Sequence, residues 1–277
     1  AGTMAAALQQ AFRSDAMSKP LHAGHAAEAG ALAALGAAKG LTGALDVLEG
    51  PAGFGAAMST TADWTKATAG LGERYNITCM TFKNHACCGH SFAAIDGALH
   101  LQSKHRFEPE AVKRIDIGGY RATVEVAGMP QARTPFEGKF STAFLVASAL
   151  VHGSVRLDAY SPERLADPRV QSLMRKVSLA IDPECAAAFP ARRSAKVTIT
   201  LRDGRSLFHY QPTRKGDPDA PLSDAELSAK FMELASPVLS TAEARRLLDE
   251  LWHGGDRDCD LAVPAGRRGL GGRAAAE

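Results

Sequence analysis

The chain has 277 residues, 45% of them hydrophobic, which is enough apolar material for one large domain or two modest domains with a buried core. Its 32 lysines and arginines nearly balance 30 aspartates and glutamates, so we expect no nucleic-acid partner. Five scattered cysteines do not fit a disulfide-stapled secreted domain and favour the reducing cytoplasm. No apolar stretch approaches the roughly 20 residues that cross a bilayer, so we expect no membrane partner.

Residues 1–78 are rich in Ala, Leu, Glu and Lys, which predicts three or more packed helices. The clearest helix spans residues 22–39, where small alanines allow close helix packing and Gly40 supplies the end. The first residues run directly into a helical pattern that contains Leu8 and Phe12. We therefore expect this segment to be part of a helical domain.

The pattern changes in residues 79–216. Apolar residues at helical spacing predict helices at residues 91–104 and 140–152. Alternating apolar and polar residues predict strands at residues 112–117, 177–181, 195–201 and 206–210, the last two joined by an Asp-Gly turn. A small antiparallel or mixed sheet with a helix on one face makes this an α+β domain.

Helices return in residues 217–253, after a linker rich in Gly, Asp and Pro. The capping-box signals are Ser223 with Glu226 and Ser240 with Glu243. Residues 254–277 are rich in Gly, Arg and Ala and have no core-forming pattern, which predicts a disordered tail. The fold class is therefore mainly α with an inserted α+β domain.

Four potential metal ligands gather in one short stretch: His85, Cys87, Cys88 and His90. Structural zinc usually needs two separated ligand pairs, and adjacent cysteines do not easily bind one tetrahedral ion. A Cys88 nucleophile activated by His90 is another interpretation, but closeness in sequence does not show that the two side chains meet. We expect no metal and no other cofactor, and the role of the cluster stays open.

Five stretches carry motifs that are weak signals when taken singly: Lys-Pro-Leu-His-Ala-Gly-His-Ala-Ala in residues 17–30, Leu-Glu-Gly and Gly-Phe in 48–54, Phe-Lys, Cys-Cys-Gly-His and Ala-Ala-Ile-Asp in 82–96, Lys-Phe-Ser in 139–141, and Pro-Leu-Ser and Lys-Phe in 221–231. Their order, up to about Trp252, resembles the MmgE/PrpD family. The ordered set is far more specific than any single motif.

The resemblance implies a helical domain built from both ends of the chain, a smaller α+β domain between them, and a homodimer. Members are similar to 2-methylcitrate dehydratase, cis-aconitate decarboxylase and iminodisuccinate epimerase, and act on small di- or tricarboxylic acids without a metal. We expect a hydro-lyase that removes a proton next to a carboxylate, as in dehydration of 2-methylcitrate. Decarboxylation and epimerisation are the alternatives.

The resemblance also implies site residues. Lys19 and Lys83 would each bind a substrate carboxylate, strengthened by partial burial, whereas the alternative is that both are ordinary surface lysines. His90 would transfer a proton or bind substrate, in a loop whose N–H groups face the substrate, and Cys88 lies where decarboxylase-like members place a histidine. His22, near a positive helix end, is a further substrate-binding candidate.

Two nearby residues are expected to be structural: His25, which would contact Glu28, and Asp96. The family's other acid/base residues belong to a Gly-His-x-x-Asp-like segment that this sequence does not contain. We therefore expect the chain to lack the N-terminal catalytic segment. A non-catalytic remnant that dimerises or binds a partner through exposed apolar helix faces is the alternative.

Overall fold

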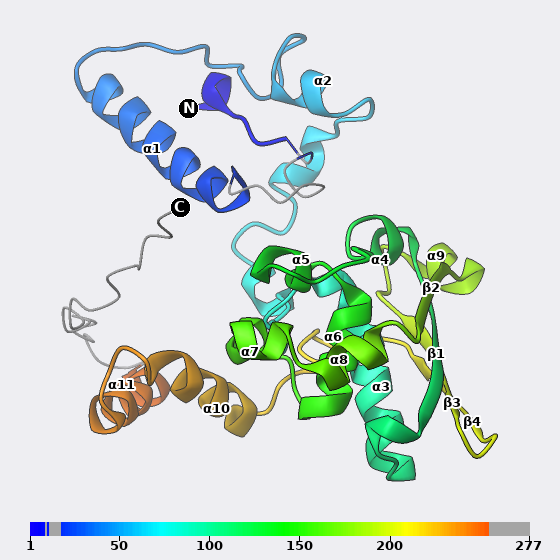
Figure 1. The fold of residues 1–277 in the computed structure, drawn as a ribbon. Coiled ribbons are helices and arrows are strands. Elements are labelled where there is room, and N and C mark those ends of the chain that lie inside the picture. Colours follow the sequence, from blue (N-terminus) through cyan, green and yellow to red (C-terminus); the bar gives the residue numbers. More distant parts are fainter. Residues whose placement is uncertain (9, 11–17, 255–277) are drawn as a thin grey trace, which may run out of the picture. The chain divides into compact units, whose positions relative to one another are not determined.

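The computed structural model describes residues 1–8, 10 and 18–254 (Figure 1). The chain divides into two units, Ala1–Pro218 and Asp219–Glu277. The predicted disordered tail lies, apart from Gly254, outside the described residues. None of the described helices is both long and apolar enough to cross a membrane.

One four-stranded mixed sheet organises the first unit, with strand order β2-β1-β3-β4. The strands are β1 (Val112–Gly119), β2 (Val177–Ile181), β3 (Ala195–Leu201) and β4 (Ser206–Gln211). Strand β1 pairs in parallel with β2 and antiparallel with β3, which pairs antiparallel with β4. All four predicted strands are confirmed, and the turn between β3 and β4 places Gly204 at a φ of 91°.

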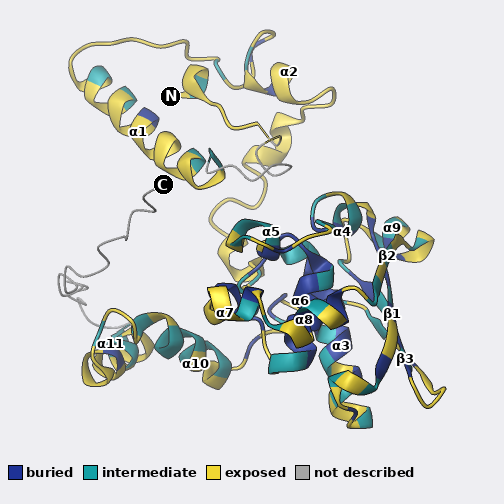
Figure 2. Cartoon of the chain, in the orientation of Figure 1, coloured by how far each residue is buried: buried dark blue, intermediate teal, exposed yellow. Residues whose placement is uncertain are grey.

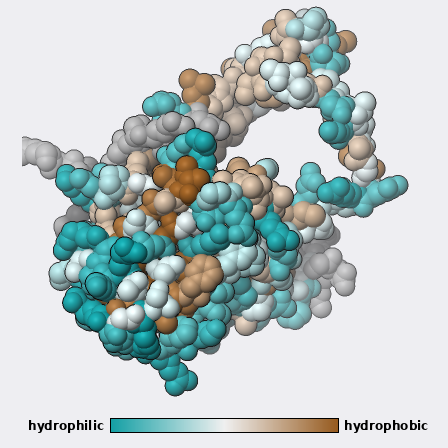
Figure 3. Space-filling view, turned by 90° about the vertical axis from the view of Figure 1, so that its right-hand side faces the viewer, coloured by the Kyte–Doolittle hydropathy of each residue, from teal (hydrophilic) through white to brown (hydrophobic). Residues whose placement is uncertain are grey.

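The period-2 alternation of the strands gives the sheet one apolar and one mixed face. Pairing aligns a row of apolar side chains across the inner face: Val177, Ile115, Ile199 and Leu207. The outer row one residue along contains polar Asp116 and Thr198 together with Phe208, which is 60% exposed. Figure 3 views the side on which Figure 1 draws β1 and β3, and this surface is mostly hydrophilic with small hydrophobic patches.

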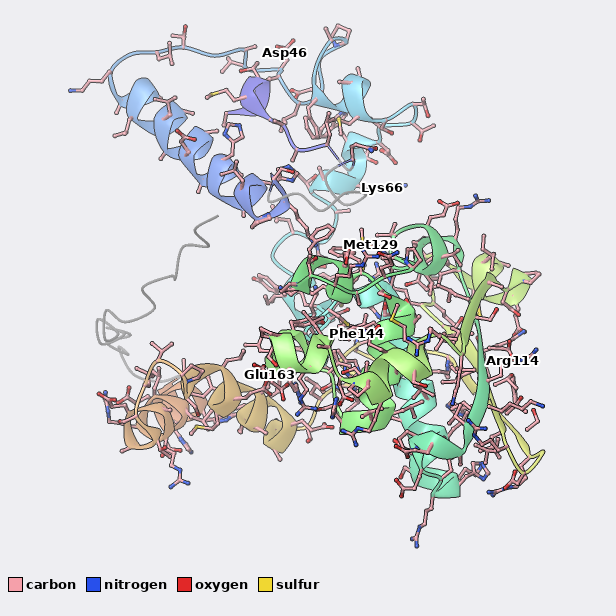
Figure 4. The ribbon with its side chains drawn as sticks, in the orientation of Figure 1. Asp46, Lys66, Arg114, Met129, Phe144 and Glu163 are labelled. Atoms are coloured by element: carbon pink, nitrogen blue, oxygen red, sulfur yellow. The ribbon has the colours of Figure 1, made fainter. Side chains whose placement is uncertain are left out.

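Helices cover the inner face of the sheet. Helix α3 (Phe92–His105) contacts β3 and β4, and α6 (Thr142–His152) contacts α3, β2 and α8 (Pro168–Met174). Phe144 of α6, labelled in Figure 4, is fully buried. Figure 2 draws much of α3 and α6 as buried. The predicted helices at 91–104 and 140–152 are thus confirmed. Four shorter helices lie in the same part of the chain: α4 (Arg121–Glu125), α5 (Pro135–Lys139), α7 (Pro162–Leu165) and α9 (Pro183–Ala188).

Residues 1–78 differ from the prediction of three or more packed helices. Their described part has two α-helices, α1 (Ser18–Ala38) and α2 (Phe54–Met58), with short 3-10 turns. Gly40 follows the end of α1 at a φ of 89°, as predicted. Glycines and a proline interrupt the segment after it, so local propensity cannot sustain long helices there. Several large apolar side chains are exposed: Leu21, Leu32, Leu35, Leu41 and Leu45.

The second unit contains α10 (Asp224–Ala235) and α11 (Thr241–His253), which pack against each other. Both predicted capping boxes are present at Ser223 and Ser240. Trp252 Nε1 donates a hydrogen bond of 3.0 Å to Ser228 Oγ and so ties the two helices together. That this unit belongs with residues 1–78 in one domain remains a prediction.

Candidate functional site

The loop before α3 is fixed by a buried hydrogen bond between a histidine and an aspartate. His85 Nε2 and Asp96 Oδ1 lie 2.8 Å apart, and their side chains are only 5% and 12% exposed. The second oxygen of Asp96 accepts a hydrogen bond from the backbone N–H of Lys215. The predicted structural role of Asp96 is therefore confirmed, and His85 is its hydrogen-bond partner.

A second buried pair holds the other side of this loop. The guanidinium of Arg214, 5% exposed, donates two hydrogen bonds to the carboxylate of Asp217. Thr81 Oγ1 donates to the same carboxylate at 2.6 Å, and Arg214 Nη1 donates to the carbonyl of Gly89. Residues 81–89 are thereby joined to the chain that follows β4, and the position of His90 is fixed from both sides.

His90 lies in the 3-10 turn Gly89–Ser91 that leads into α3. Its Nδ1 shares a hydrogen bond of 2.8 Å with the hydroxyl of Tyr120, a side chain that is 1% exposed. Burial lowers the pKa of His90 to about 4, and the positive charges of Arg193, Arg214 and Lys83 add to this effect. The imidazole is therefore neutral at pH 7.

Tyr120 follows the end of β1 and completes this polar centre. Burial raises the pKa of its phenol to about 12, although Arg193 and Arg214 oppose the shift. Tyr120 therefore keeps its proton at neutral pH. The ring of Phe189 stacks on Tyr120 at 4.5 Å and meets the ring of His90 edge-on at 6.5 Å.

The structure brings three of the predicted site residues together in one loop. Lys83 Nζ donates to the carbonyl of Cys87 at 3.4 Å, and its charge acts on His90. Cys88 is partly buried, and its N–H donates to the carbonyl of Lys139. Lys83, Cys88 and His90 therefore form one candidate site.

Lys19 of α1 reaches a neighbouring position. Its Nζ lies 4.9 Å from the centre of the Phe140 ring. Phe140 directly follows Lys139, whose carbonyl accepts the hydrogen bond from the N–H of Cys88. Lys19 and Lys83 are both exposed, so the partial burial expected of them is not found. Their charges are consequently more weakly coupled to a ligand than burial would make them.

Residues 85–254 match the model of the MmgE/PrpD C-terminal domain, and residues 1–67 match that of the MmgE/PrpD N-terminal domain. The chain belongs to the MmgE/PrpD family. The first match includes Cys88, His90 and the whole sheet, whereas Lys83 lies between the two matched segments. The second includes Lys19, so the site draws on both matched segments.

Curated relatives in this family are cis-aconitate decarboxylases. The chain is 26% identical to the mouse protein and 27% identical to the human protein over 228 residues, which cover 80% of this chain. The cis-aconitate decarboxylase-like protein oryM of Aspergillus oryzae is 26% identical over 191 residues, or 66% of this chain. These regions cover 46%, 47% and 39% of the relatives, so the chain spans about half the length of the first two.

His22, a predicted substrate-binding residue, lies away from this loop in the sequence. It lies on α1 beside a separate groove of about 530 Å³ that Leu21 and His25 also line. His25 Nδ1 is 3.6 Å from Glu28 Oε2, which confirms their predicted contact. The described part of α1 starts at Ser18, so His22 lies more than one turn into the helix, past the N–H groups that favour anions.

The soft ligands of the His85–His90 stretch point to different partners. His85 binds Asp96, and His90 binds Tyr120. Burial raises the pKa of the Cys87 thiol well above its ordinary value, so this cysteine stays protonated. Among the described residues, no group of three or more His, Cys, Asp or Glu side chains could hold a metal ion. Independence from metals stays a prediction.

Tyr120, Phe189 and Arg193 are not marked as site residues by any motif in the sequence. Gly118 and Gly119, at the end of a predicted strand, are a local sign of close packing beside the backbone, and the side chains that pack there are those of Asp182 and Thr123. Phe189 and Arg193 carry no comparable local signal. Only the pairing of β1 with β3 brings their segment to His90.

Proposed function

We propose that the chain acts as a lyase, or as part of one, on a small di- or tricarboxylic acid by transferring a proton at a carbon next to a carboxylate. The observation that carries this proposal is a neutral His90, held by buried Tyr120 and surrounded by the charges of Lys83, Arg193 and Arg214. A neutral imidazole accepts a proton, and nearby cations stabilise the negative charge that develops on the substrate.

The electrostatics link proton transfer to substrate binding. Burial and the surrounding cations hold the pKa of His90 at about 4. A bound polycarboxylate brings negative charge next to the imidazole and raises its pKa toward neutrality. His90 therefore becomes a stronger base when a substrate is present.

The remaining predicted residues have binding roles in this proposal. Lys19 and Lys83 each bind a carboxylate, in keeping with the family resemblance, and Cys88 lines the site from the same loop as His90. His22 stays a predicted substrate-binding residue, and it lies beside a groove on α1. Tyr120 keeps its proton at neutral pH and is suited to donate it to a leaving group.

Dehydration of a 2-methylcitrate-like acid is the first candidate reaction, because it requires both a base and an acid, and His90 and Tyr120 supply one of each. Decarboxylation of cis-aconitate is the second candidate and is favoured by the names of the curated relatives. A cytoplasmic homodimer remains the expected form of the protein.

The test is to incubate the purified chain with 2-methylcitrate and with cis-aconitate and to measure alkene formation and CO₂ release. His90→Gln should abolish turnover, whereas His105→Gln, a matched change at the other end of α3, should leave it unchanged. Tyr120→Phe should slow dehydration more than it weakens substrate binding. Equal activity of His90→Gln and the unsubstituted protein would refute the proposed role of His90.

Binding should be measured on the same samples by thermal shift, because a ligand that binds only the folded protein raises its melting temperature. A shift with one acid that Lys83→Ala and Lys19→Ala both remove would identify the ligand class. Oligomers that form without any response to these acids would favour the non-catalytic alternative.

A further inference from the structure

The segment between α9 and β3 lies against the His90–Tyr120 pair. In the antiparallel ladder, Gly118 of β1 pairs with Lys196 of β3. Continuing that register by two residues in each strand direction sets Tyr120 opposite Ser194. Arg193 is therefore adjacent to the strand position that faces Tyr120.

Aromatic contacts fix the same segment independently. Phe189 stacks on Tyr120 with an angle of 14° between the rings and also contacts His90. Phe189 is 36% exposed, so it forms an apolar wall at the edge of the site. An apolar wall excludes water and strengthens charge interactions beside it.

Arg193 is the charged group with the largest electrostatic effect on both members of the pair. Burial is the main influence on the pKa of His90 and of Tyr120, and the charge of Arg193 is the next largest for each. The charge of Arg193 thus affects two groups that lie on different elements, the imidazole of His90 and the phenol of Tyr120. The guanidinium acts directly on the polar centre of the site.

No described residue neutralises the charge of Arg193. Its side chain is partly buried and makes no hydrogen bond or ion pair with any other described residue. The neighbouring Arg214, in contrast, is fully engaged by Asp217. Partial burial of an unpaired guanidinium is unfavourable, and a carboxylate that binds it with two parallel hydrogen bonds offsets that cost.

We propose that Arg193 binds a substrate carboxylate other than those bound by Lys19 and Lys83, and so selects tricarboxylic over dicarboxylic acids. This inference rests on the proposed function. Lys19, Lys83 and Arg193 then each bind one of the three carboxylates. Arg214 has a structural role, because it is paired with Asp217. The planar guanidinium also fixes the orientation of its carboxylate, which a lysine does not do.

The test compares two acids that differ by one carboxylate, tricarballylate and glutarate, by isothermal titration calorimetry. The unsubstituted protein should bind tricarballylate roughly tenfold to a hundredfold more tightly. Arg193→Gln should lose that preference while still binding glutarate normally. Arg193→Lys should retain part of it, because a point charge replaces a two-pronged contact.

Arg192→Gln is the matched control, because Arg192 is adjacent in sequence but exposed. It should keep the full preference for tricarballylate. Thermal unfolding of each variant shows whether it is folded. Glutarate binding shows whether the rest of its binding site is intact.

The possible outcomes separate the two proposals. If the unsubstituted protein binds neither acid, the proposed function fails and the inference fails with it. If it binds both acids equally, or if Arg193→Gln keeps the preference, the role of Arg193 is wrong while the proposed function stands.

Discussion

The buried Arg214–Asp217 pair gives a prediction that follows directly from burial. Replacing Asp217 with Ala leaves the guanidinium of Arg214, 5% exposed, without its countercharge. Removing one partner of a buried pair costs about 3–5 kcal/mol, because the remaining charge is desolvated and unpaired. Thr81 also loses its acceptor, so the free energy of unfolding should fall by at least the lower figure.

The assay is urea unfolding followed by circular dichroism, with Asp203→Ala as the control. Asp203 forms an equivalent pair with Arg205, but those two side chains are 52% and 56% exposed. An exposed pair in water contributes little, so the control should unfold at the same urea concentration as the unsubstituted protein. Equal losses in both variants would refute the argument from burial.

The site should also change, since the same pair fixes the carbonyl of Gly89 beside His90. In Asp217→Ala the charge of Arg214 is no longer balanced and acts more strongly on the imidazole. The pKa of His90 should therefore fall below its value in the unsubstituted protein, as measured by NMR titration. An unchanged His90 titration would show that Arg214 and His90 are not coupled.

Three further predictions concern titration and packing. Without ligand, His90 should titrate with a pKa of about 4, and this pKa should rise when tricarballylate binds. NMR titration of His90 with and without tricarballylate tests both expectations. Burial alone would raise the pKa of Asp217, but its hydrogen bonds with Arg214 outweigh burial and lower this pKa. The carboxylate therefore stabilises the fold above the unfolded pKa, and this stabilisation is lost as the pH falls through the lower folded pKa. Lowering the pH below 4 should therefore reduce the melting temperature of the unsubstituted protein more than that of Asp217→Asn. Ile199→Ala should cost about 2–5 kcal/mol in urea unfolding, because Ile199 is fully buried, whereas Thr198→Ala on the outer face should cost much less.

Local sequence was sufficient for most of the regular structure after residue 79. Strands β2 and β3 match their predicted ranges, because alternating apolar and polar residues suit a sheet with one buried face. The capping boxes at Ser223 and Ser240 begin helices as predicted, since the contacts that define a cap lie within four residues. The family motifs likewise identified Lys83 and His90 as neighbours in one loop.

Residues 1–78 show where such local signals stop being informative. An alanine-rich composition predicted several packed helices, but after α1 the described chain forms mainly turns. Glycine and proline break the backbone pattern there, whatever the propensity of the residues between them. Composition counts favourable residues, whereas a helix needs them in an unbroken run.

The site itself was only half predictable, because its parts come from distant segments. Tyr120 and Phe189 reach His90 from 30 and 99 positions further along the chain. The sequence determined which groups could do chemistry, since residue type fixes charge and proton affinity in water. Only the tertiary structure decided which groups do meet, because burial, strand register and ring stacking depend on contacts between segments that no local pattern records. That is why His90, an ordinary histidine in the sequence, is a partly buried, neutral imidazole in the fold.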